Sequence, residues 1–561
     1  MSTQGKISNK KWMEDVKEEL KDNYIGYFAA TTVHGLKYLT EPRRPWPERV
    51  LWFFGVLIGL VACIFLMIKF TTRWEESPVI IAMDESHRTV WQIPFPAVTI
   101  CPQAKTRTEF FNYTDYAIRY KKGSLTKNEE SLLAQVQVPC RIPIRVDNNN
   151  TKIDRNATHI IKKFALVKDD VVEIANMNPF VDPEFQPILT REGVCFSFNM
   201  MPAKYMFREK TYHASNGDLQ YSANATVQWD PTTGYEKDIN LKFAYPRPAL
   251  GVGDESGLSM TLKTKLKYLH SMCNTLGHGF QVILHSPIEF PQLRHETVFV
   301  PLNTFSEIFL TPHEIRTSQD LRDSYTPEQR QCYFHDERYL KYFKFYTQKN
   351  CELECLANIT LASCGCVEFY MPRMPNTIVC GKDEFCAKRV AGNFYITEEQ
   401  SPKSGKNCKK CHKIQQTPCN CLQSCAHIRY NSHHIQSVLD TETAKQILHS
   451  KELVTNETTK RSHVSIFYKD SLFIPVRRVE VFGLSDLLAS LGGLMGLCMG
   501  ISLLSVIELF YWMLIRPFCQ RIKQTNPQLR SIKKQNRTQN VETAVQYSRY
   551  LENEASKQNN L

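Results

Sequence analysis

The chain has 561 residues, a formal net charge of +12 and 19 cysteines. Two stretches without charged residues, 50–68 and 487–507, are each long enough to cross a hydrocarbon core of roughly 30 Å, which excludes a wholly water-soluble protein. No nucleic-acid-binding motif accompanies the basic excess, so we expect the basic residues to lie beside anionic membrane lipid and no nucleic acid to bind.

The segment 1–49 is a polar N-terminal tail. Its dipeptide His34-Gly35 is a weak motif by itself, because such a pair recurs by chance and suits an ordinary turn. Prolines then stop any helix and set the entry into the first span, which we place at 50–70. This span is too long and too far from the N-terminus for a cleaved signal peptide.

The central segment, 71–485, contains the main folded domain. Three cysteines, Cys63, Cys498 and Cys519, lie in or beside the two spans, and the other sixteen all fall in this segment. An even number of cysteines confined to one segment indicates disulfides in an oxidising, extracellular compartment.

Glycosylation sequons support this orientation. Six Asn-x-Ser/Thr triplets lie in the central segment, and they begin at Asn112, Asn149, Asn156, Asn224, Asn358 and Asn456. Basic residues lie just before the first span, such as Arg49, and just after the second, such as Arg516. They are consistent with a cytosolic 1–49 tail and a cytosolic 516–561 tail. The protein is therefore expected in the plasma membrane with two spans and both termini in the cytosol.

Short runs of β-branched and aromatic residues predict strands through most of the central segment. They begin near Pro94, Gly193, Leu258, Phe280 and Glu296, with polar loops between them. Helical spacing returns at 327–356, where Tyr339, Phe343 and Tyr346 can share one face. On that helix Cys351 and Cys355 point the same way, and an extended Cys419–Cys421 strand opposite would form nested disulfides.

Catalytic or metal chemistry is disfavoured. The cysteines between 408 and 425, with His412 and His427 nearby, could be drawn as a zinc site, but an oxidising compartment favours disulfides. No nucleophile elbow, HExxH or P-loop motif occurs, so we expect neither an enzyme nor a bound cofactor or metal.

The second apolar stretch, which we place at 486–515, is a poor plain anchor. Gly492, Gly496 and Gly500 recur every fourth residue and would let neighbouring backbones approach closely. Ser502 and Glu508 add polar groups, which indicate a pore or a buried pair. The alternative is a helix that dimerises through its glycines, with Glu508 extended toward the cytosol.

Proteins with two spans and one large disulfide-rich outer domain are mainly channels, receptor scaffolds or tethered enzymes. A scaffold would need only one span and no intramembrane carboxylate. ATP-gated purinergic channels share the two-span plan but carry fewer cysteines and a lysine-lined nucleotide site.

The residues from His34 to Tyr511 resemble the degenerin/epithelial sodium channel family, and most closely its insect pickpocket branch. The resemblance rests on His34-Gly35, on FPAVTIC at 95–101 and GVCFSF at 193–198, and on the cysteine run 332–425. It closes with LGGLMGLCMGISLLSVIELFYW at 491–512. It implies an α+β membrane protein, in which two transmembrane helices flank a β-rich ectodomain with palm, β-ball, finger, thumb and knuckle.

The function that the resemblance implies is that of a sodium-selective, amiloride-sensitive-type channel subunit in a homo- or heterotrimer of family subunits. It would be gated by an extracellular chemical or mechanical stimulus in sensory or epithelial cells, with permeant Na⁺ but no cofactor and with no ligand indicated. The alternative is a non-conducting receptor or accessory subunit that needs a partner of the same family.

Site residues follow from the same resemblance. The selectivity filter falls on Gly500-Ile501-Ser502, with Glu508 as the carboxylate below it, facing the ion path or a neighbouring subunit. His34-Gly35 is the cytosolic gating motif, and Ala489 stands where bulky residues hold such channels open. The implied disulfides are Cys101–Cys195, Cys332–Cys425, Cys351–Cys421, Cys355–Cys419, Cys364–Cys386 and Cys366–Cys380, which leaves Cys408–Cys411 and Cys140–Cys273 as the remaining pairs.

One departure from the family pattern affects the outer mouth. Acid-sensing members carry Asp-Ile-Gly-Gly where this chain has Ser490-Leu491-Gly492-Gly493, so that acidic ring is absent. Asp486, one turn earlier, is the candidate replacement. Proton gating and calcium block are therefore not carried over.

Overall fold

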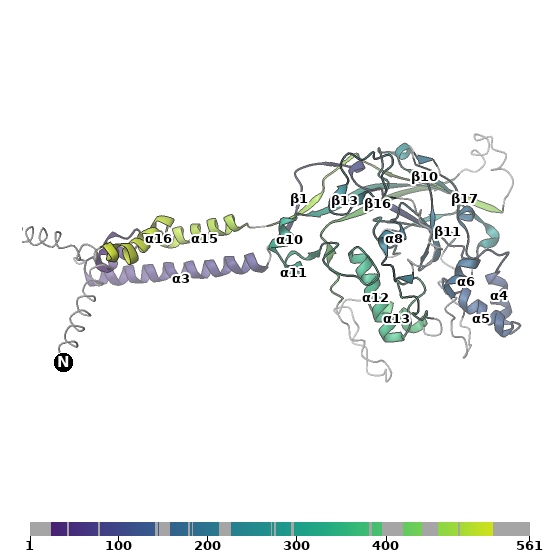
Figure 1. The fold of residues 1–561 in the computed structure, drawn as a ribbon, viewed down its shortest axis with the longest axis horizontal. Helices are drawn as coiled ribbons and strands as arrows, with labels where there is room; N and C mark the ends of the chain where they lie inside the picture. The colour runs from purple at the N-terminus through teal and green to yellow at the C-terminus, as the bar shows by residue number, and fades with distance from the viewer. Residues whose placement is uncertain are drawn as a thin grey trace, which may run out of the picture. The chain divides into compact units, whose positions relative to one another are not determined.

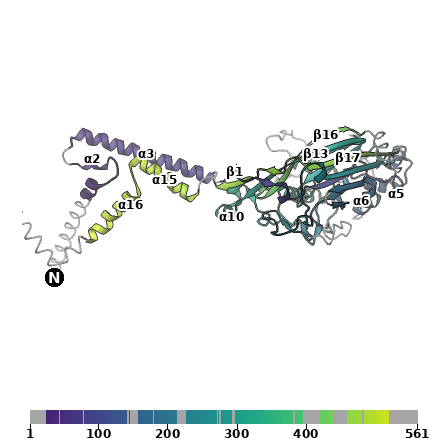
Figure 2. The same cartoon turned by 90° about the horizontal axis from the view of Figure 1, so that it is seen from above.

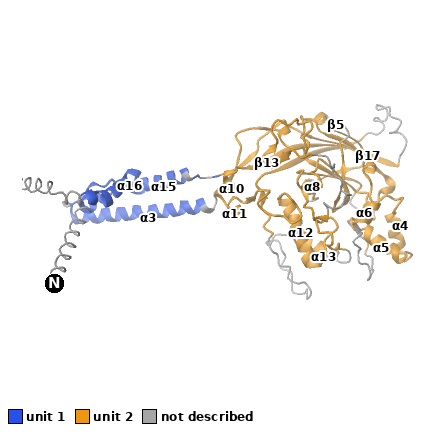
Figure 3. Cartoon of the chain, in the orientation of Figure 1, with its two compact units in different colours: residues 1–78, 480–561 blue, residues 79–479 orange. Residues whose placement is uncertain are grey.

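The computed structural model describes residues 24–519, apart from gaps at 42–43, 77–78, 141–143, 145–156, 178–179, 182, 213–225, 271, 274–276, 293–296, 381–383, 395–418, 440–457 and 481–482. The chain divides into two compact units (Figure 3). One comprises residues 1–78 with 480–561, and the other residues 79–479.

The first unit is helical. Its elements are a helix at 24–30, α2 (Leu36–Thr40), α3 (Trp46–Glu76), α15 (Leu484–Met499), α16 (Leu503–Phe510) and a π-helical turn, Tyr511–Ile515. Helix α3 begins just after Pro45, and Pro47 occupies its first turn, where a missing N–H costs no hydrogen bond. It extends beyond the predicted 50–70 at both ends.

Helix α3 is the one described helix that is long and apolar enough to cross a membrane unaided, over Trp46–Trp74. The pair Ser485–Met499 and Leu503–Cys519 meets the same criterion only when taken together, because a 75° bend separates its halves. Large apolar side chains along α3 are exposed, as Leu51 and Ile58 illustrate, so this surface suits a lipid environment rather than a protein core.

The second unit is built on two sheets (Figure 1). The larger has eight strands in the order β1-β19-β13-β17-β10-β4-β5, with β16 also paired to β13. The smaller has five strands in the order β12-β11-β3-β7-β6. The strands of the larger sheet are β1 (Val79–Met83), β4 (Val172–Met177), β5 (Phe180–Val181), β10 (Leu258–Lys265), β13 (Thr304–Thr317), β16 (His427–Val438), β17 (Thr459–Tyr468) and β19 (Val476–Glu480).

The remaining elements are short. The strands of the smaller sheet are β3 (Ala97–Pro102), β6 (Gln186–Thr190), β7 (Gly193–Phe198), β11 (Gly279–His285) and β12 (Thr297–Pro301). Three further pairs of strands are β2 (Arg88–Thr89) with β18 (Leu472–Phe473), β8 (Trp229–Asp230) with β9 (Gly234–Tyr235), and β14 (Cys332–Tyr333) with β15 (Gln423–Ser424). Single helical turns are η1 (Val90–Gln92), α7 (Lys168–Val171), α8 (Ala203–Met206), η2 (Asp254–Ser256), η3 (Leu266–Tyr268), α10 (Asp320–Ser324) and α11 (Pro327–Arg330).

Residue patterns explain why these strands form where they do. Strand β10 alternates buried and half-buried residues, as a strand with only one face in the core requires. Strand β3 is buried at every position because β11 and β7 flank it in the middle of its sheet. Five predicted strands, near Pro94, Gly193, Leu258, Phe280 and Glu296, correspond to β3, β7, β10, β11 and β12. The long pair β13 and β16 was not predicted.

Two groups of helices pack beside the sheets (Figure 1). Helices α4 (Tyr113–Lys121), α5 (Lys127–Val136) and α6 (Ala157–Phe164) form a small separate core, and the Cys140–Cys273 disulfide belongs to it. Helix α12 (Gln348–Cys364) packs with α13 (Glu384–Phe394). Helix α12 begins at its Thr347 cap and ends at Gly365, which takes a left-handed conformation.

Among the described residues of this unit there are seven disulfides. They join Cys101–Cys195, Cys140–Cys273, Cys332–Cys425, Cys351–Cys421, Cys355–Cys419, Cys364–Cys386 and Cys366–Cys380, which are the pairs given above. The expected pair Cys408–Cys411 lies outside the described residues. Of the sequon asparagines, Asn358 is exposed on α12 and Asn112 caps α4, whereas Asn149, Asn156, Asn224 and Asn456 lie outside the described residues.

The predicted continuous helix at 327–356 is wrong. Helix α11 stops after one turn because Gln331 adopts a left-handed backbone, and α12 starts only at Gln348. Tyr339 is 72% exposed while Phe343 and Tyr346 are each 1% exposed, so the three aromatic rings do not share a face. The intervening segment is instead fixed by strand β14 and by the Cys332–Cys425 disulfide.

The predicted strand at Cys419–Cys421 is also wrong, although the two nested disulfides to α12 are present. Residues 419–422 have no regular secondary structure, and Asn420 is left-handed with a φ of 42°. The Arg338 guanidinium accounts for this shape, because it donates to the carbonyl oxygens of both Cys419 and Asn420.

Acid is expected to destabilise the second unit through its buried histidines. Burial in β11 lowers the pKa of His285 to about 4, and its Nε2 lies 2.9 Å from the Thr99 hydroxyl. The unfolded imidazole titrates near 6.5, so the unfolded chain binds more protons between about pH 4 and 6.5. This contribution to stability is fully present above that window and is lost as pH falls through it, by about 1.4 kcal/mol per unit of pKa shift.

We therefore expect the melting temperature of the full chain to fall between pH 7 and pH 5. The fall should be smaller in His285→Gln, whose amide can still bond to Thr99 but cannot titrate. Burial also lowers the pKa of His427 to about 4, so part of the pH dependence should persist in the variant. Equal pH slopes for the variant and the wild type would contradict this assignment.

Candidate functional site

A break in the C-terminal helix lies at 500–502. Helix α15 ends at Gly500, whose φ of +66° is left-handed and therefore favours glycine. The Gly500 N–H donates to the Gly496 carbonyl at 2.9 Å, and the Ile501 N–H donates to that of Met495 at 3.3 Å. The carbonyls of the last turn are thus partly satisfied, and the chain is free to change direction.

Ser502 starts the next helix. Its backbone is extended, and its hydroxyl oxygen accepts from the Ser505 N–H at 3.3 Å, while the Ser502 N–H donates to the Ser505 hydroxyl at 3.1 Å. This reciprocal pair is a capping box in which Ser505 takes the place of the usual Glu or Gln. The Ser-x-x-Ser pattern at 502–505 was readable in the sequence, although Ser505 was not singled out.

An N-terminal segment, 31–35, lies against the break. The His34 N–H donates to the Met499 carbonyl at 3.0 Å. The His34 ring covers Gly500 so closely that a Cβ added to Gly500 would overlap the imidazole, at 2.7 Å from Cγ. Gly35 has a φ of +87°, and a Cβ there would lie 2.5 Å from a Val56 methyl group. The two glycines are thus required by backbone conformation and by close packing.

The same segment binds Glu508. Oε2 of Glu508 accepts from the Thr32 N–H at 3.2 Å and from the Thr32 hydroxyl at 3.0 Å. The Thr32 hydroxyl oxygen also lies 2.8 Å from that of Ser505. Glu508 is therefore bonded within its own chain, and its place at the ion path or beside another subunit stays a prediction. No sequence pattern singles out Thr32, which lies two residues before His34.

A further contact in this unit joins α3 and α15. The two helices lie side by side, and α16 diverges from α3 after the break (Figure 2). Apart from its chain neighbours and the nearby backbone of its own helix, no described atom lies within 4 Å of a Cβ added to Gly492, and the nearest to Gly496 is the Ile501 carbonyl oxygen at 3.8 Å. The glycine that permits close packing is instead Gly59 on α3, where a Cβ would lie 3.1 Å from the Cys498 carbonyl oxygen.

Two further predicted residues lie near the start of α15. Ala489 is exposed on this helix. Asp486 is exposed in its first turn, and its Oδ2 accepts from the Gly483 N–H at 3.1 Å. A carboxylate in a first turn is favourable for the helix dipole, so Asp486 has a structural role in addition to any role at the outer mouth.

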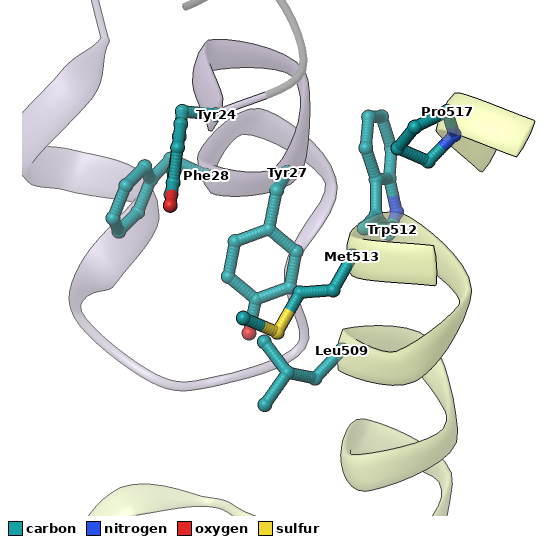
Figure 4. A pocket seen from close by; sticks show the side chains of 7 residues that line it. All are labelled: Tyr24, Tyr27, Phe28, Leu509, Trp512, Met513 and Pro517. Carbon is teal, nitrogen blue, oxygen red and sulfur yellow. The ribbon is translucent and has the colours of Figure 1, made fainter. Parts of the chain in front are cut away.

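An aromatic pocket of about 180 Å³ lies at the C-terminal end of α16, beside the 24–30 helix (Figure 4). It is lined by Tyr24, Tyr27, Phe28, Leu509, Trp512, Met513 and Pro517. The Trp512 ring meets Tyr27 edge to face at 6.4 Å and carries the Arg516 guanidinium at 3.6 Å. A Cβ on Gly26 would lie 2.7 Å from Trp512, so the 24–30 helix is held tightly against this end of the chain.

Chemically, this arrangement offers backbone carbonyls, hydroxyls and one carboxylate at a helix break in an apolar pair of helices. Irregular backbone is tolerated at membrane depth where it lines water, and carbonyl oxygens can replace the hydration shell of a cation. The described residues contain no group of three or more His, Cys, Asp or Glu side chains placed to hold a metal. The geometry favours ion passage over catalysis.

Comparison with known proteins agrees with this interpretation. Residues 27–512 match the family described as amiloride-sensitive sodium channel. Pickpocket protein 28 of Drosophila melanogaster is 26% identical over 530 residues, which cover 89% of this chain and 79% of that protein. Sodium channel protein Nach of the same organism is 21% identical over 510 residues, with 88% and 87% covered. The bile acid-sensitive ion channel of Homo sapiens is 25% identical over 511 residues, with 87% and 86% covered.

Proposed function

The chain belongs to the amiloride-sensitive sodium channel family, whose members are ion channels and not enzymes, and on this premise we propose that it is a sodium-selective channel subunit. The observation that carries the proposal is the break at Gly500-Ile501-Ser502, with Glu508 two turns beyond it. In this proposal the carbonyls at the break form the selectivity filter.

The proposed topology has two spans. Helix α3 is the first, and α15 with α16 is a second, broken span, so both the 1–49 tail and the 516–561 tail lie in the cytosol. The disulfide-rich unit would then be extracellular, with the eight-stranded sheet as palm and the five-stranded sheet as β-ball. The disulfides and the exposed sequon residue Asn358 support that side.

Assembly is proposed as a trimer of family subunits, either of this chain alone or with relatives. Three copies of the 500–502 break around one axis would supply a ring of carbonyl oxygens. Gly492 and Gly493 have no neighbour within 4 Å among the described residues of this chain, which leaves room for another subunit. An extracellular chemical or mechanical stimulus would open the channel.

The direct test is whole-cell current in cells that express the chain. We expect an inward sodium current that amiloride blocks and that disappears when sodium is replaced by a large organic cation. Absence of current from surface-expressed chain alone, with current restored by a co-expressed family member, would favour an accessory subunit. A current that does not discriminate sodium from potassium would contradict the selectivity assignment.

Substitution at Ala489 is expected to increase the current. Ala489 is exposed on α15, so a tryptophan there fits this chain without internal overlap and acts only where the subunits meet. We expect Ala489→Trp to raise the resting current several-fold without a stimulus. Leu488→Trp, at the adjacent exposed position, is the matched control, and an equal rise in both variants would contradict a specific role for Ala489.

A further inference from the structure

Gly26, in the 24–30 helix, packs directly against the indole of Trp512. A Cβ added to Gly26 would lie 2.7 Å from Cζ3 and 2.9 Å from Cη2 of Trp512. Carbon atoms in contact are normally about 3.5–4.0 Å apart, so only glycine fits this contact. The backbone of Gly26 is helical and not left-handed, and alanine favours a helix over glycine. The absence of a side chain therefore serves the contact and not the conformation.

Other groups fix the position of this indole (Figure 4). The Tyr27 ring meets it edge to face at 6.4 Å between centroids, and the Arg516 guanidinium carbon lies 3.6 Å from its centre. Trp512 also belongs to the π-helical turn Tyr511–Ile515, a rare geometry that does not continue the α-helical path of α16. An indole that moved away from Gly26 would lose one or more of these contacts.

Residues 24–35, which we call the N-terminal strap, contact the C-terminal helix in reverse order. From the N-terminus onward the contacts are those of Gly26 with Trp512, Thr32 with Glu508, and His34 with Met499. The Thr31 N–H donates to the Tyr27 carbonyl at 2.7 Å, which joins the 24–30 helix to the segment that lies on the break. The position of the helix is thus passed on to that segment.

We propose that Gly26 is a positioning residue for the selectivity filter. Because Gly26 has no side chain, Trp512 can hold the strap in the place that sets His34 over the break. Gly26 itself touches no ion and acts through Trp512 and the strap. This role rests on the proposed function, since it requires that the 500–502 break conducts, whereas the packing of Gly26 on Trp512 does not.

A methyl group at position 26 should displace the strap. The helix or the indole would have to shift by about 1 Å to restore normal carbon–carbon contact. The two hydrogen bonds from Thr32 to Glu508 are 3.2 and 3.0 Å long. A displacement of that size would stretch them beyond hydrogen-bonding distance.

The first arm of the test records sodium current at matched surface expression. We expect Gly26→Ala to lower the current at least about threefold, because a site displaced by about 1 Å works poorly. The ratio of sodium to potassium permeability should also move toward one, which a mere loss of protein would not cause. Gly55→Ala is the matched control and should conduct as the wild type does. Apart from its chain neighbours and the nearby backbone of α3, no described atom lies within 4 Å of a Cβ added to Gly55.

A second substitution tests whether the loss comes from this contact. Trp512→Phe removes Cζ3 and Cη2, the two atoms that a Cβ at position 26 would overlap. The double variant Gly26→Ala, Trp512→Phe should therefore recover to within about twofold of Trp512→Phe alone, because the two residues are coupled. A helix that alanine had simply unfolded would show no such recovery.

The second arm does not depend on conduction. The hydroxyl oxygens of Thr32 and Ser505 lie 2.8 Å apart, so Thr32→Cys with Ser505→Cys should form a disulfide on mild oxidation. The full chain used has serine at the free cysteines Cys63, Cys498 and Cys519, and mass spectrometry of its digest measures the cross-link. We expect Gly26→Ala to slow cross-linking at least about threefold and Trp512→Phe to restore it.

A Gly26→Ala chain that conducts and selects as the wild type does would overturn the role of Gly26. So would an unchanged cross-linking rate, or a double variant that does not recover. Cross-linking that responds as expected in a chain without any sodium current would leave the contact of Gly26 with Trp512 standing and refute the proposed function.

Discussion

Replacing Gly500 by alanine is expected to reduce the sodium current by about tenfold or more. The φ of +66° at Gly500 costs a residue with a Cβ roughly 1–2 kcal/mol. The larger cost is steric, because the added methyl group would overlap the His34 ring. Either α15 must end elsewhere or the N-terminal segment must leave the break, and both outcomes disturb the proposed filter. Whole-cell recording with surface biotinylation separates loss of conduction from loss of protein.

The steric part of this effect can be isolated. In the double variant Gly500→Ala, His34→Ala the overlap with the imidazole is gone, but the cost of a left-handed backbone at residue 500 remains. We therefore expect the sodium current to recover partly relative to Gly500→Ala alone. Gly496→Ala is the matched control, since it lies one turn earlier and its Cβ would make only an ordinary contact at 3.8 Å. A Gly500→Ala channel that conducts and selects as the wild type does would remove this residue from the filter.

The second large effect is expected at Glu508, where length and charge can be separated. Oε2 of Glu508 accepts two hydrogen bonds from Thr32. Glu508→Asp keeps the charge but withdraws the oxygen by about one carbon–carbon bond, so it should break both bonds. Glu508→Gln keeps the length and one carbonyl oxygen but loses the charge. If the bonds to Thr32 dominate, the aspartate variant should lose several-fold more current than the glutamine variant.

The reverse order would show that Glu508 acts by its charge on the ion path, which is the role first expected of it. A further check uses Thr32→Val, which removes the hydroxyl donor and retains the backbone donor. Combined with Glu508→Asp it should add little to the loss, because both substitutions break the same contact. Additive losses would mean that the two residues act independently. Recordings at matched surface expression measure the loss of sodium current in each single variant and in the double variant.

The family resemblance placed the selectivity filter at Gly500-Ile501-Ser502, but it did not give the contacts that cover this segment. The contacts of His34 with Gly500 and of Thr32 with Glu508 join residues more than 460 positions apart. No local pattern encodes such contacts. Gly59 was missed for the same reason, since its role depends on which helix lies opposite.

The central segment shows a similar division. Strands β3, β7, β10, β11 and β12 were predicted from short runs whose composition alone favours extended structure. The segment 331–347 looked helical because its aromatic spacing fits a helix, yet a disulfide and the left-handed Gln331 decide its path. Strand β13 carries Pro312 within its length, a residue that normally argues against a strand.

The order of strands in the eight-stranded sheet affects how the chain can be synthesised. Strand β17 lies between β10 and β13, and β19 lies between β13 and β1, although both are made after almost all of the second unit has been translated. A nascent chain shorter than about 459 residues therefore presents unpaired edges on β10 and β13. Exposed edges of this kind pair readily with other chains. This sheet can therefore close only after strands β17 and β19 have been translated, so the edges of β10 and β13 stay uncovered for most of the synthesis of this unit.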